Sequence, residues 1–404
     1  MNADREMTAL HGRIITGTEV ISDGVVTFSD GVITWVGHAR DFTGHATDTG
    51  ATLVPGFVDL HCHGGGGAGF SGDPDAARAA AAYHRSRGTT TQMASLVSAP
   101  GDVLETQVCA LAPLVQRGEL AGIHLEGPFL SAAKCGAQDP AAIIPGDPKL
   151  LGRVLDAGGG TVLSQTLAPE TAHFAELVAL LRARGAVPCV GHTSADAATT
   201  RQALQSSSGK WCATHLFNAM PPLLHREPGP VSACLSAAAS GDMVVELIAD
   251  GVHLAPETVR MVFDLVGPGQ VALVTDAMAA AGMADGDYML GALDVRVEEG
   301  VARLRDAAHR GADGKLPIAG GTASMIDVVR HTVAAGVDLL SAVQAATVTP
   351  ARLIGAYAGS IALRYPANIV ALGDNLEPVR IWFRGEELSG RTTSAAGTPA
   401  PSHP

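Results

Sequence analysis

The middle of the chain alternates short apolar runs with longer stretches of helical periodicity. Runs of this length are typical of buried strands, and strands that alternate with helices predict parallel βαβ units. Eight of them favour a (β/α)8 barrel of the TIM type over an open doubly wound sheet, although periodicity alone leaves closure open. The runs are Leu53–Leu60, Thr89–Leu96, Gly122–Leu125, Val162–Leu167, Val187–Val190, Trp211–Thr214, Val244–Ile248 and Val271–Thr275.

The segments between the runs carry apolar positions at helical spacing. Pro74–Arg87 and Thr171–Arg184 are two examples that we predict as helices. Met289–Leu304, which follows the eighth run, has the pattern of an additional hairpin.

Both ends of the chain have a β pattern instead. We expect them to pair into a small β-sandwich domain made of residues 1–52 and 358–388, with the barrel over residues 53–357. Residues 389–404 are rich in Ser, Thr, Ala and Pro and are expected to be disordered. The strand-like segments at the two ends are Arg13–Ile15, Val25–Phe28, Ile33–Val36, Asn368–Leu372 and Val379–Phe383.

Composition narrows the class of protein. With 404 residues, 47% of them apolar, the chain can bury a large core. Its formal net charge of −13, without a Lys/Arg cluster, argues against a nucleic-acid partner. An anionic small molecule would need local positive groups.

Cysteine usage and the N-terminus bear on the compartment. The six cysteines form no Cys-x-x-Cys pair, so we expect reduced thiols. The first residues lack the pattern of a signal peptide, and no apolar run is long enough to span a membrane. A cytoplasmic protein without a membrane partner is the expectation.

Side chains that can bind a metal ion stand at the ends of six of the eight runs. Chemistry in (β/α)8 barrels is located at the carboxyl ends of the strands, so we expect these side chains to converge. The run ends are Asp59–His63, His124–Glu126, His192, His215, Asp250–His253 and Asp276.

The spacing of these residues suggests a metal site. His61 and His63 are two apart on an extended chain, so both imidazoles project from one face. Glu126 follows an apolar strand, where an ionised carboxylate is costly unless it is paired or bound to metal. Taken singly, each residue, like His192 and His215, has a structural alternative. Together they indicate a site whose imidazole and carboxylate donors suit zinc, iron or a similar divalent ion.

Asp276 ends the last run and is the candidate for proton transfer. A bound divalent ion lowers the pKa of its water to about 7, and a neighbouring carboxylate can accept the proton and deliver it to a leaving amine. A helix N-cap is the structural alternative.

Two glycine-rich segments are weaker candidates. Gly64–Gly67 lacks the ending of a phosphate loop and is interpreted as a close backbone approach to the site. Gly320–Ser324 is interpreted as a helix cap, with a substrate-contacting turn as the alternative.

From about Val54 to Leu353 the chain resembles the N-acetylglucosamine-6-phosphate deacetylases, a family within the amidohydrolase superfamily. Pro55–Gly64 is shared widely across the superfamily, whereas Thr214–Met220 and Arg226–Gly229 are more specific to this family. The other matching segments are His124–Phe129, Thr166–Glu170, Gly191–Thr193, Ala249–His253 and Val274–Met278.

The resemblance implies a role for each matching residue. Glu126, His192 and His215 match the ligands of the principal metal ion, and His61 and His63 match a pair that holds a second ion in some members. Asp276 matches the catalytic acid/base, and His253 matches a residue that contacts the substrate and polarises its acetyl carbonyl.

Further matches concern the phosphate group and the partner. Asn218 and Ala219 match a segment whose backbone meets the phosphate. Arg226 matches an arginine that reaches the phosphate from the neighbouring subunit of a homodimer, and its guanidinium suits phosphate oxygens. Gln138 is a departure, because many relatives carry a substrate-contacting His there. Cys135 lies in the same segment, which in relatives forms a loop near the site. A plain exposed thiol is the alternative interpretation of Cys135.

The implied activity is metal-dependent hydrolysis of the acetamido group of N-acetylglucosamine 6-phosphate. One or two ions per subunit are expected, with zinc ahead of iron or another divalent ion. A deacetylase of another N-acyl sugar or of an N-acyl amino acid is one alternative. A non-catalytic sugar-phosphate sensor is another, but a sensor would be expected to lose Asp276 or a metal ligand.

Overall fold

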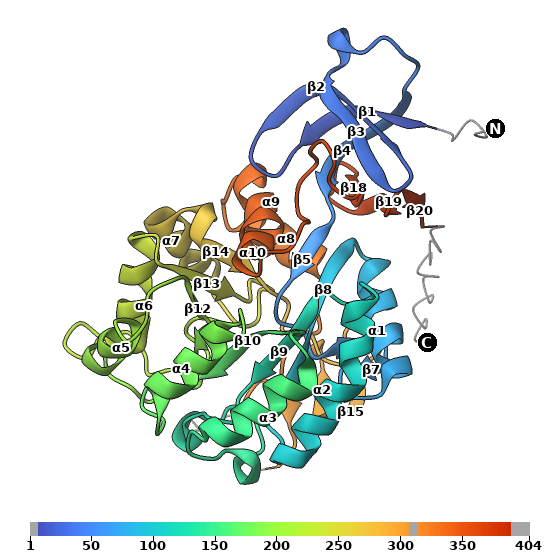
Figure 1. Cartoon of the computed structure of the whole chain (residues 1–404). Coiled ribbons are helices and arrows are strands. Elements are labelled where there is room, and N and C mark those ends of the chain that lie inside the picture. Colours follow the sequence, from blue (N-terminus) through green and yellow to red (C-terminus); the bar gives the residue numbers. More distant parts are fainter. Residues whose placement is uncertain (1–6, 307–313, 315, 389–404) are drawn as a thin grey trace, which may run out of the picture.

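A parallel barrel forms the larger part of the molecule (Figure 1). The computed structural model describes residues 7–306, 314 and 316–388. Eight strands follow one another in sequence order around the barrel, each parallel to the next, so the predicted (β/α)8 fold is confirmed. They are β5 (Phe57–Asp59), β8 (Thr89–Val97), β9 (Gly122–Glu126), β10 (Val162–Leu167), β11 (Val187–Val190), β12 (Trp211–Ala213), β13 (Met243–Leu247) and β14 (Val271–Leu273).

Contacts just beyond the first and last strands join the two edges of this sheet. Cys62 and Ala277 form a parallel bridge. The backbone N–H of Asp276 donates to the oxygen of His61 at 2.9 Å, and the N–H of His63 donates to that of Ala277 at 2.7 Å. The edges are therefore joined through residues that flank the predicted metal donors.

Helices cover the outside of the barrel (Figure 1). In α2, Leu104, Val108 and Leu111 are buried at helical spacing against the strands. Several helices begin at an aspartate N-cap whose carboxylate accepts a backbone N–H, namely Asp73, Asp147, Asp196 and Asp338. The helices are α1 (Pro74–Arg85), α2 (Gly101–Gln116), α3 (Pro148–Gly158), α4 (Phe174–Ala183), α5 (Ala197–Leu204), α6 (Gly229–Ala239), α7 (Pro256–Val266), α8 (Met325–Ala334), α9 (Leu339–Ala346) and α10 (Val348–Leu353).

A second, smaller β domain combines both ends of the chain in one seven-stranded sheet, ordered β20-β19-β18-β4-β1-β2-β3. Strand β4 lies between β1, to which it is parallel, and β18, to which it is antiparallel. The N-terminal and C-terminal segments therefore depend on each other. The strands are β1 (Thr8–Ile15), β2 (Val20–Ser29), β3 (Val32–His38), β4 (Thr47–Pro55), β18 (Ile369–Leu372), β19 (Pro378–Phe383) and β20 (Glu386–Glu387).

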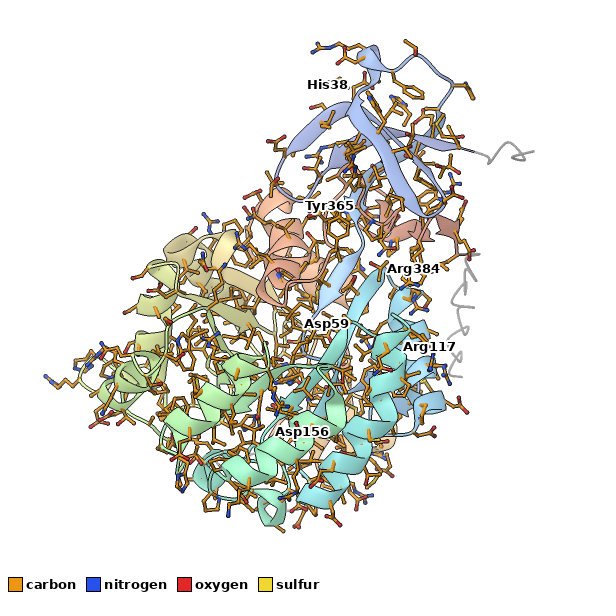
Figure 2. All side chains as sticks on the ribbon, viewed as in Figure 1. His38, Asp59, Arg117, Asp156, Tyr365 and Arg384 are labelled. Carbon is orange, nitrogen blue, oxygen red and sulfur yellow. The ribbon has the colours of Figure 1, made fainter. Side chains whose placement is uncertain are left out.

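The small domain also contacts the barrel. The Arg384 guanidinium donates to the oxygen of Gly118 at 2.8 Å, close to the labelled Arg117 in Figure 2. The guanidinium carbon of Arg85 lies 4.2 Å from the ring centroid of Phe383.

The first predicted run is divided between the two domains. Leu53–Pro55 belongs to β4, and the barrel begins with β5 at Phe57. Gly56 lies between them, and a Cβ there would be 2.2 Å from Oγ1 of Thr90. The residues on either side of Gly56, Leu53–Pro55 and Phe57–Val58, are buried and apolar, so the sequence pattern does not mark the change of sheet.

The expected hairpin at Met289–Leu304 is part of a three-stranded antiparallel sheet. Its strands are β15 (Gly286–Leu290), β16 (Leu293–Glu298) and β17 (Val301–Leu304). Leu290 and Val295 pack in one apolar cluster with Met278, two residues after Asp276. The insertion therefore covers the segment that follows the last barrel strand.

Other expectations have mixed outcomes. All six cysteines, each in a described part of the chain, are free thiols, as predicted. The tail predicted to be disordered, 389–404, lies outside the described residues. Across the described residues, we find no helix with the length and apolar character needed to traverse a bilayer.

Candidate active site

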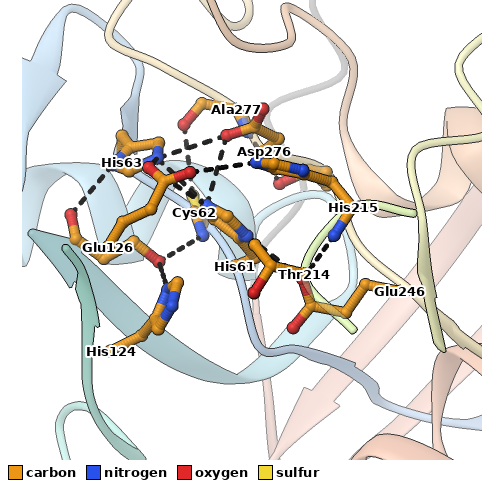
Figure 3. A network of polar contacts seen from close by, with 12 residues as sticks. His61, Cys62, His63, His124, Glu126, Thr214, His215, Glu246, Asp276 and Ala277 are labelled. Carbon is orange, nitrogen blue, oxygen red and sulfur yellow. Dashed lines mark hydrogen bonds and ion pairs between the residues drawn. The ribbon is translucent and has the colours of Figure 1, made fainter. Parts of the chain in front are cut away.

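The predicted metal donors converge at the carboxyl end of the barrel, and all of them except His192 are labelled in Figure 3. His61 and His63 follow β5, Glu126 ends β9, and the remaining three follow β11, β12 and β14. All six side chains are buried. The three donors after the later strands are His192, His215 and Asp276.

Glu126 lies between two groups of imidazoles. Its Oε1 is 2.9 Å from Nε2 of His192 and 3.0 Å from Nε2 of His215. Its Oε2 is 3.1 Å from Nε2 of His63 and 3.6 Å from Nε2 of His61. One carboxylate thus faces two donor groups, one at each oxygen.

Asp276 completes the second group. Its Oδ1 is 3.2 Å from Nε2 of His63 and 3.5 Å from Nε2 of His61. Two sets of atoms lie within 4.8 Å of one another, one from His61, His63 and Asp276 and one from His61, Glu126 and His215.

The outer ring nitrogens show how these donors suit a cation. Nδ1 of His63 donates to the backbone oxygen of Ser95 at 3.0 Å, and Nδ1 of His192 donates to that of Lys134 at 2.9 Å. A neutral ring whose proton is on Nδ1 presents a lone pair at Nε2, which here faces Glu126. Two lone pairs this close require a proton or a metal ion between them. The residues present therefore fit a divalent ion.

The charges at the site shift the pKa values strongly. Burial lowers the pKa of His63, but hydrogen bonds to Asp276 and Glu126 and their charges raise it to about 9. Burial raises the pKa of Asp276, but the charges of His61 and His63 and the hydrogen bond from His63 lower it to about 2. Protons on the imidazoles thus balance the carboxylates, and a metal ion would displace them.

Glu246, the fourth of the five residues of β13, supports the site from below (Figure 3). Its Oε2 accepts from Nδ1 of His61 at 3.2 Å and from the backbone N–H of His215 at 3.1 Å. This contact directs Nε2 of His61 toward the other donors. The sequence interpretation missed Glu246 because it lies inside an apolar run, although a lone carboxylate in such a strand is itself a signal.

His124 and Asp59 are two more buried groups without a predicted role. Nδ1 of His124 is 3.0 Å from the hydroxyl of Ser95, and its Nε2 is 2.9 Å from that of Thr166. Burial lowers the pKa of His124, so its ring is neutral. The Asp59 carboxylate accepts from the hydroxyl of Thr275 at 2.6 Å, which ties β5 to β14.

The donors open into a cavity of about 250 Å³. Asn218, Ala219, Gln138 and His253, four of the candidate substrate residues, line this cavity. Nδ1 of His253 lies 2.8 Å from Oδ2 of Asp250, and this contact holds the ring in place. Lining residues that the sequence interpretation did not single out are Gly136, Ala137, Leu290, Pro317 and Ile318.

Backbone strain accompanies the site. His192, His215 and Asp276 have φ values of 45°, 27° and 47°. Residues other than glycine rarely adopt this left-handed region, and such strain concentrates at functional sites. Each occurs within three residues of the end of a barrel strand, and its side chain lies among the predicted metal donors.

Both glycine-rich segments make contacts that leave no room for a side chain. A Cβ on Gly321 would lie 2.4 Å from the oxygen of Thr275, and one on Gly65 would lie 2.5 Å from Nε2 of His84. Ser324 forms the predicted cap, a capping box with Asp327, while Gly320 lines the cavity.

Two of the predicted substrate residues, both in the described part of the chain, do not line this cavity. Arg226 is exposed and Cys135 is partly buried. The backbone oxygen of Cys135 accepts from the N–H of Gln138 at 2.9 Å, and the three residues that follow Cys135 line the cavity.

Comparison with known proteins agrees with this geometry. The model of the amidohydrolase family matches residues 52–388, which is most of the chain. The chain belongs to the amidohydrolase family. Members of this family are generally metal-dependent, and the protein is a metal-dependent hydrolase of this kind.

Individual amidohydrolases of known activity are similar over most of their length. An N-acetylglucosamine-6-phosphate deacetylase from Bos taurus is 35% identical over 352 residues, 83% of each chain. An N-acetylgalactosamine-6-phosphate deacetylase from Escherichia coli is 31% identical, covering 83% of this chain and 88% of its own.

A solved structure is similar as well. It is a mutant N-acetyl-D-glucosamine-6-phosphate deacetylase from Mycobacterium smegmatis in complex with N-acetyl-D-glucosamine-6-phosphate. It is 42% identical with a TM-score of 0.89, and the match covers 95% of this chain and 99% of that one.

Proposed function

We propose that this amidohydrolase removes the acetyl group of N-acetylglucosamine 6-phosphate, giving glucosamine 6-phosphate and acetate. The observation that carries the proposal is the Glu126 carboxylate between two groups of buried imidazoles, with Asp276 facing one of them. The similarity to deacetylases of 6-phosphorylated amino sugars supports the choice of substrate.

Glu126, His192 and His215 would hold the principal ion, and His61 and His63 would hold a second ion that shares Glu126. Zinc is the ion that we propose, because it favours imidazole and carboxylate donors. When bound, such an ion lowers the pKa of water to about 7 and polarises a carbonyl oxygen.

Asp276 has the properties of the proton-transfer group. Burial raises the pKa of this carboxylate, but the charges of His61 and His63 lower it to about 2 in the metal-free protein, so the group is ionised there. An ionised carboxylate beside a metal ion can accept a proton from water. The same group then delivers that proton to the departing nitrogen. His253, whose ring is oriented by Asp250, lines the same cavity and would contact the acetyl carbonyl.

The phosphate is proposed to lie against the segment of Asn218 and Ala219 at the edge of the cavity. Ala219 has a φ of 50°, an unusual conformation that gives this turn a defined shape. This acidic chain has no Lys or Arg among the described cavity residues, so another positive group is needed for the phosphate.

We propose that Arg226 supplies this charge to the neighbouring subunit of a homodimer. Arg226 is exposed, and the nearby Leu223 and Leu224 are 47% and 49% exposed. Leu223 also lines an apolar groove with Met261 that reaches His253. Apolar exposure of this kind marks an interaction surface.

A second candidate substrate is the galacto epimer, N-acetylgalactosamine 6-phosphate. Two relatives at 31% and 34% identity carry that name, which favours this candidate over a deacetylase of an N-acyl amino acid. The intact donor set with Asp276 argues against a non-catalytic sensor.

The deciding experiment measures acetate release from the two epimeric 6-phosphates and from unphosphorylated N-acetylglucosamine, together with the metal content of the purified protein. We expect the gluco 6-phosphate to have the highest kcat/KM. Faster turnover of the galacto epimer would select the second candidate. Equal rates for the unphosphorylated sugar would contradict the role given to the phosphate, and absence of acetate release would contradict the function.

A further inference from the structure

The buried side chain of Gln138 joins the predicted ligand Glu126 to the end of β8. Gln138 is 3% exposed. Its Nε2 donates to Oε2 of Glu126 at 2.6 Å, and its Oε1 accepts from the backbone N–H of Ser98 at 2.7 Å. Both ends of the amide are therefore occupied inside the protein.

The partners leave only one orientation for this amide. A backbone N–H can only donate, and an ionised carboxylate can only accept. Rotating the amide by 180° would oppose two donors at Ser98 and two acceptors at Glu126. The donor is consequently the group that faces Glu126, as the hydrogen-bond network requires.

The carboxylate oxygen that receives this bond is Oε2, which faces His63. The other oxygen, Oε1, faces His192 and His215. The terminal torsion of a glutamate is soft, so an isolated carboxylate would rotate easily. The bond from Gln138 limits this rotation and keeps each oxygen directed at its own group of imidazoles.

The segment that contains Gln138 also makes a hydrogen bond to a second predicted metal ligand, His192. The backbone oxygen of Lys134 accepts from Nδ1 of His192 at 2.9 Å. The hydroxyl of Ser98 donates to the backbone oxygen of Glu126 at 3.0 Å, so the main chain of Glu126 is fixed as well. The contacts of Gln138 thus form part of a frame around the shared carboxylate.

We propose that Gln138 is a positioning residue for Glu126, which sets the affinity of the site for divalent ions by orienting the carboxylate shared between the two donor groups. The inference rests on the ligand set given under the proposed function. In this proposal Gln138 acts mainly by orienting a metal ligand. Its second amide hydrogen remains able to contact a molecule in the cavity that Gln138 lines.

The test is the zinc affinity of the full-length protein carrying Gln138→Leu, measured by competition with a chromophoric chelator. Leucine has a similar volume and removes both hydrogen bonds. Loss of a group that orients a metal ligand typically weakens metal binding about 10- to 100-fold, and we expect a loss in this range. Zinc affinity equal to that of the unsubstituted protein would overturn the proposal.

Gln165→Leu is the matched control. Gln165 is 1% exposed, and its Nε2 donates at 2.8 Å to the backbone oxygen of Gly127, the neighbour of Glu126, instead of to a predicted ligand side chain. We expect this variant to keep its zinc affinity even if its unfolding midpoint falls. Equal losses of zinc affinity in both variants would show a general effect of packing and would refute the specific role of Gln138.

Two more variants keep the test decisive. If Gln138→Leu does not fold, Gln138→Asn retains the amide but is too short to contact Ser98 and Glu126 together, so it should also bind zinc more weakly. Glu126→Gln tests the ligand set itself. If Glu126→Gln binds zinc normally, the proposed ligands are wrong. If it loses zinc while both Gln138 variants bind normally, only the present inference fails.

Discussion

The two ends of the barrel interior are built from the same strands but differ in chemistry. In β13, Val244 and Glu246 are two residues apart and share a face. Val244 packs with Met93 and Cys189 in an apolar cluster, whereas Glu246 binds His61 below the predicted metal donors. A step of two residues therefore separates aliphatic packing from a network of buried charges.

The difference shows how each end is stabilised. The apolar end requires only that side chains of suitable volume meet, because burial of apolar surface is favourable without directional contacts. The polar end buries carboxylates and imidazoles, which is costly unless each is paired. Predictions about the two ends should accordingly diverge in measurable ways.

Substitutions at the two ends of the barrel interior should differ most in their effect on kcat. Asp276→Asn should lower kcat by about 10²- to 10⁴-fold, because the amide cannot accept the proton from water. KM should change little. Val244→Ala, at the apolar end, should leave kcat nearly unchanged. Steady-state acetate release checks both, and near-normal kcat in Asp276→Asn would refute the assignment of the catalytic group.

Acid should weaken the protein through a group beside the polar end. His84 is buried next to Gly64, and burial lowers its pKa to about 4, although a hydrogen bond to the oxygen of Gly64 opposes this. The unfolded chain, with a pKa near 6.5, binds the proton more readily. The contribution of His84 is fully present above about pH 6.5 and should fall by up to about 3 kcal/mol as pH drops to about 4.

Urea unfolding of metal-free protein between pH 7 and pH 4 measures this slope. His84→Gln removes the titrating group, so its free energy of unfolding should depend less steeply on pH over this range. Identical slopes for the two proteins would contradict the neutral state of buried His84.

Zinc should stabilise the polar end specifically. At about 100 times the dissociation constant, a ligand that binds only the folded state adds about 2.7 kcal/mol to the free energy of unfolding. Binding should also release protons, since the pKa of His63 is raised to about 9 without the ion. Calorimetry in buffers of different ionisation enthalpy counts these protons. The effect should persist in Val244→Ala and be smaller in His192→Ala, which removes a ligand of the principal ion only.

The smallest effects come from two variants, one of which should lose mainly stability and the other mainly zinc affinity. Val244→Ala should cost roughly 2 kcal/mol of unfolding free energy through lost burial and a cavity, with zinc affinity unchanged. Glu246→Gln keeps the volume and an acceptor for His61, so it should cost less stability but weaken zinc binding by about 10-fold. Thermal unfolding and chelator competition on both variants would show whether the two ends are independent, and parallel losses would show that they are not.

The convergence of the predicted metal donors could be expected from the sequence, because parallel strands place all their carboxyl ends at one edge. His192 and His215 lie after two different strands, yet both contact Oε1 of Glu126. The spacing of His61 and His63 likewise predicted a shared direction, and both face Oε2. These positions follow from strand order alone.

Other features could not be predicted in this way. Glu246 lies 185 residues from His61, and nothing local marks them as partners. The change from β4 to β5 at Gly56 is not visible in the sequence, because the residues on both sides of Gly56 are buried and apolar. The hydrogen bonds of Gln138 also depend on how a loop after β9 packs against β8.

The alternation of strands and helices, the location of the donors at strand ends and the family of the chain can all be inferred from the residues in order. These follow from periodicity and from residue identity at fixed steps along the chain. The folded chain was needed to show which oxygen of Glu126 faces which imidazoles, which buried groups support them and how the first and last strands meet. Such contacts join residues far apart in the chain, and their geometry depends on packing, which local sequence does not encode.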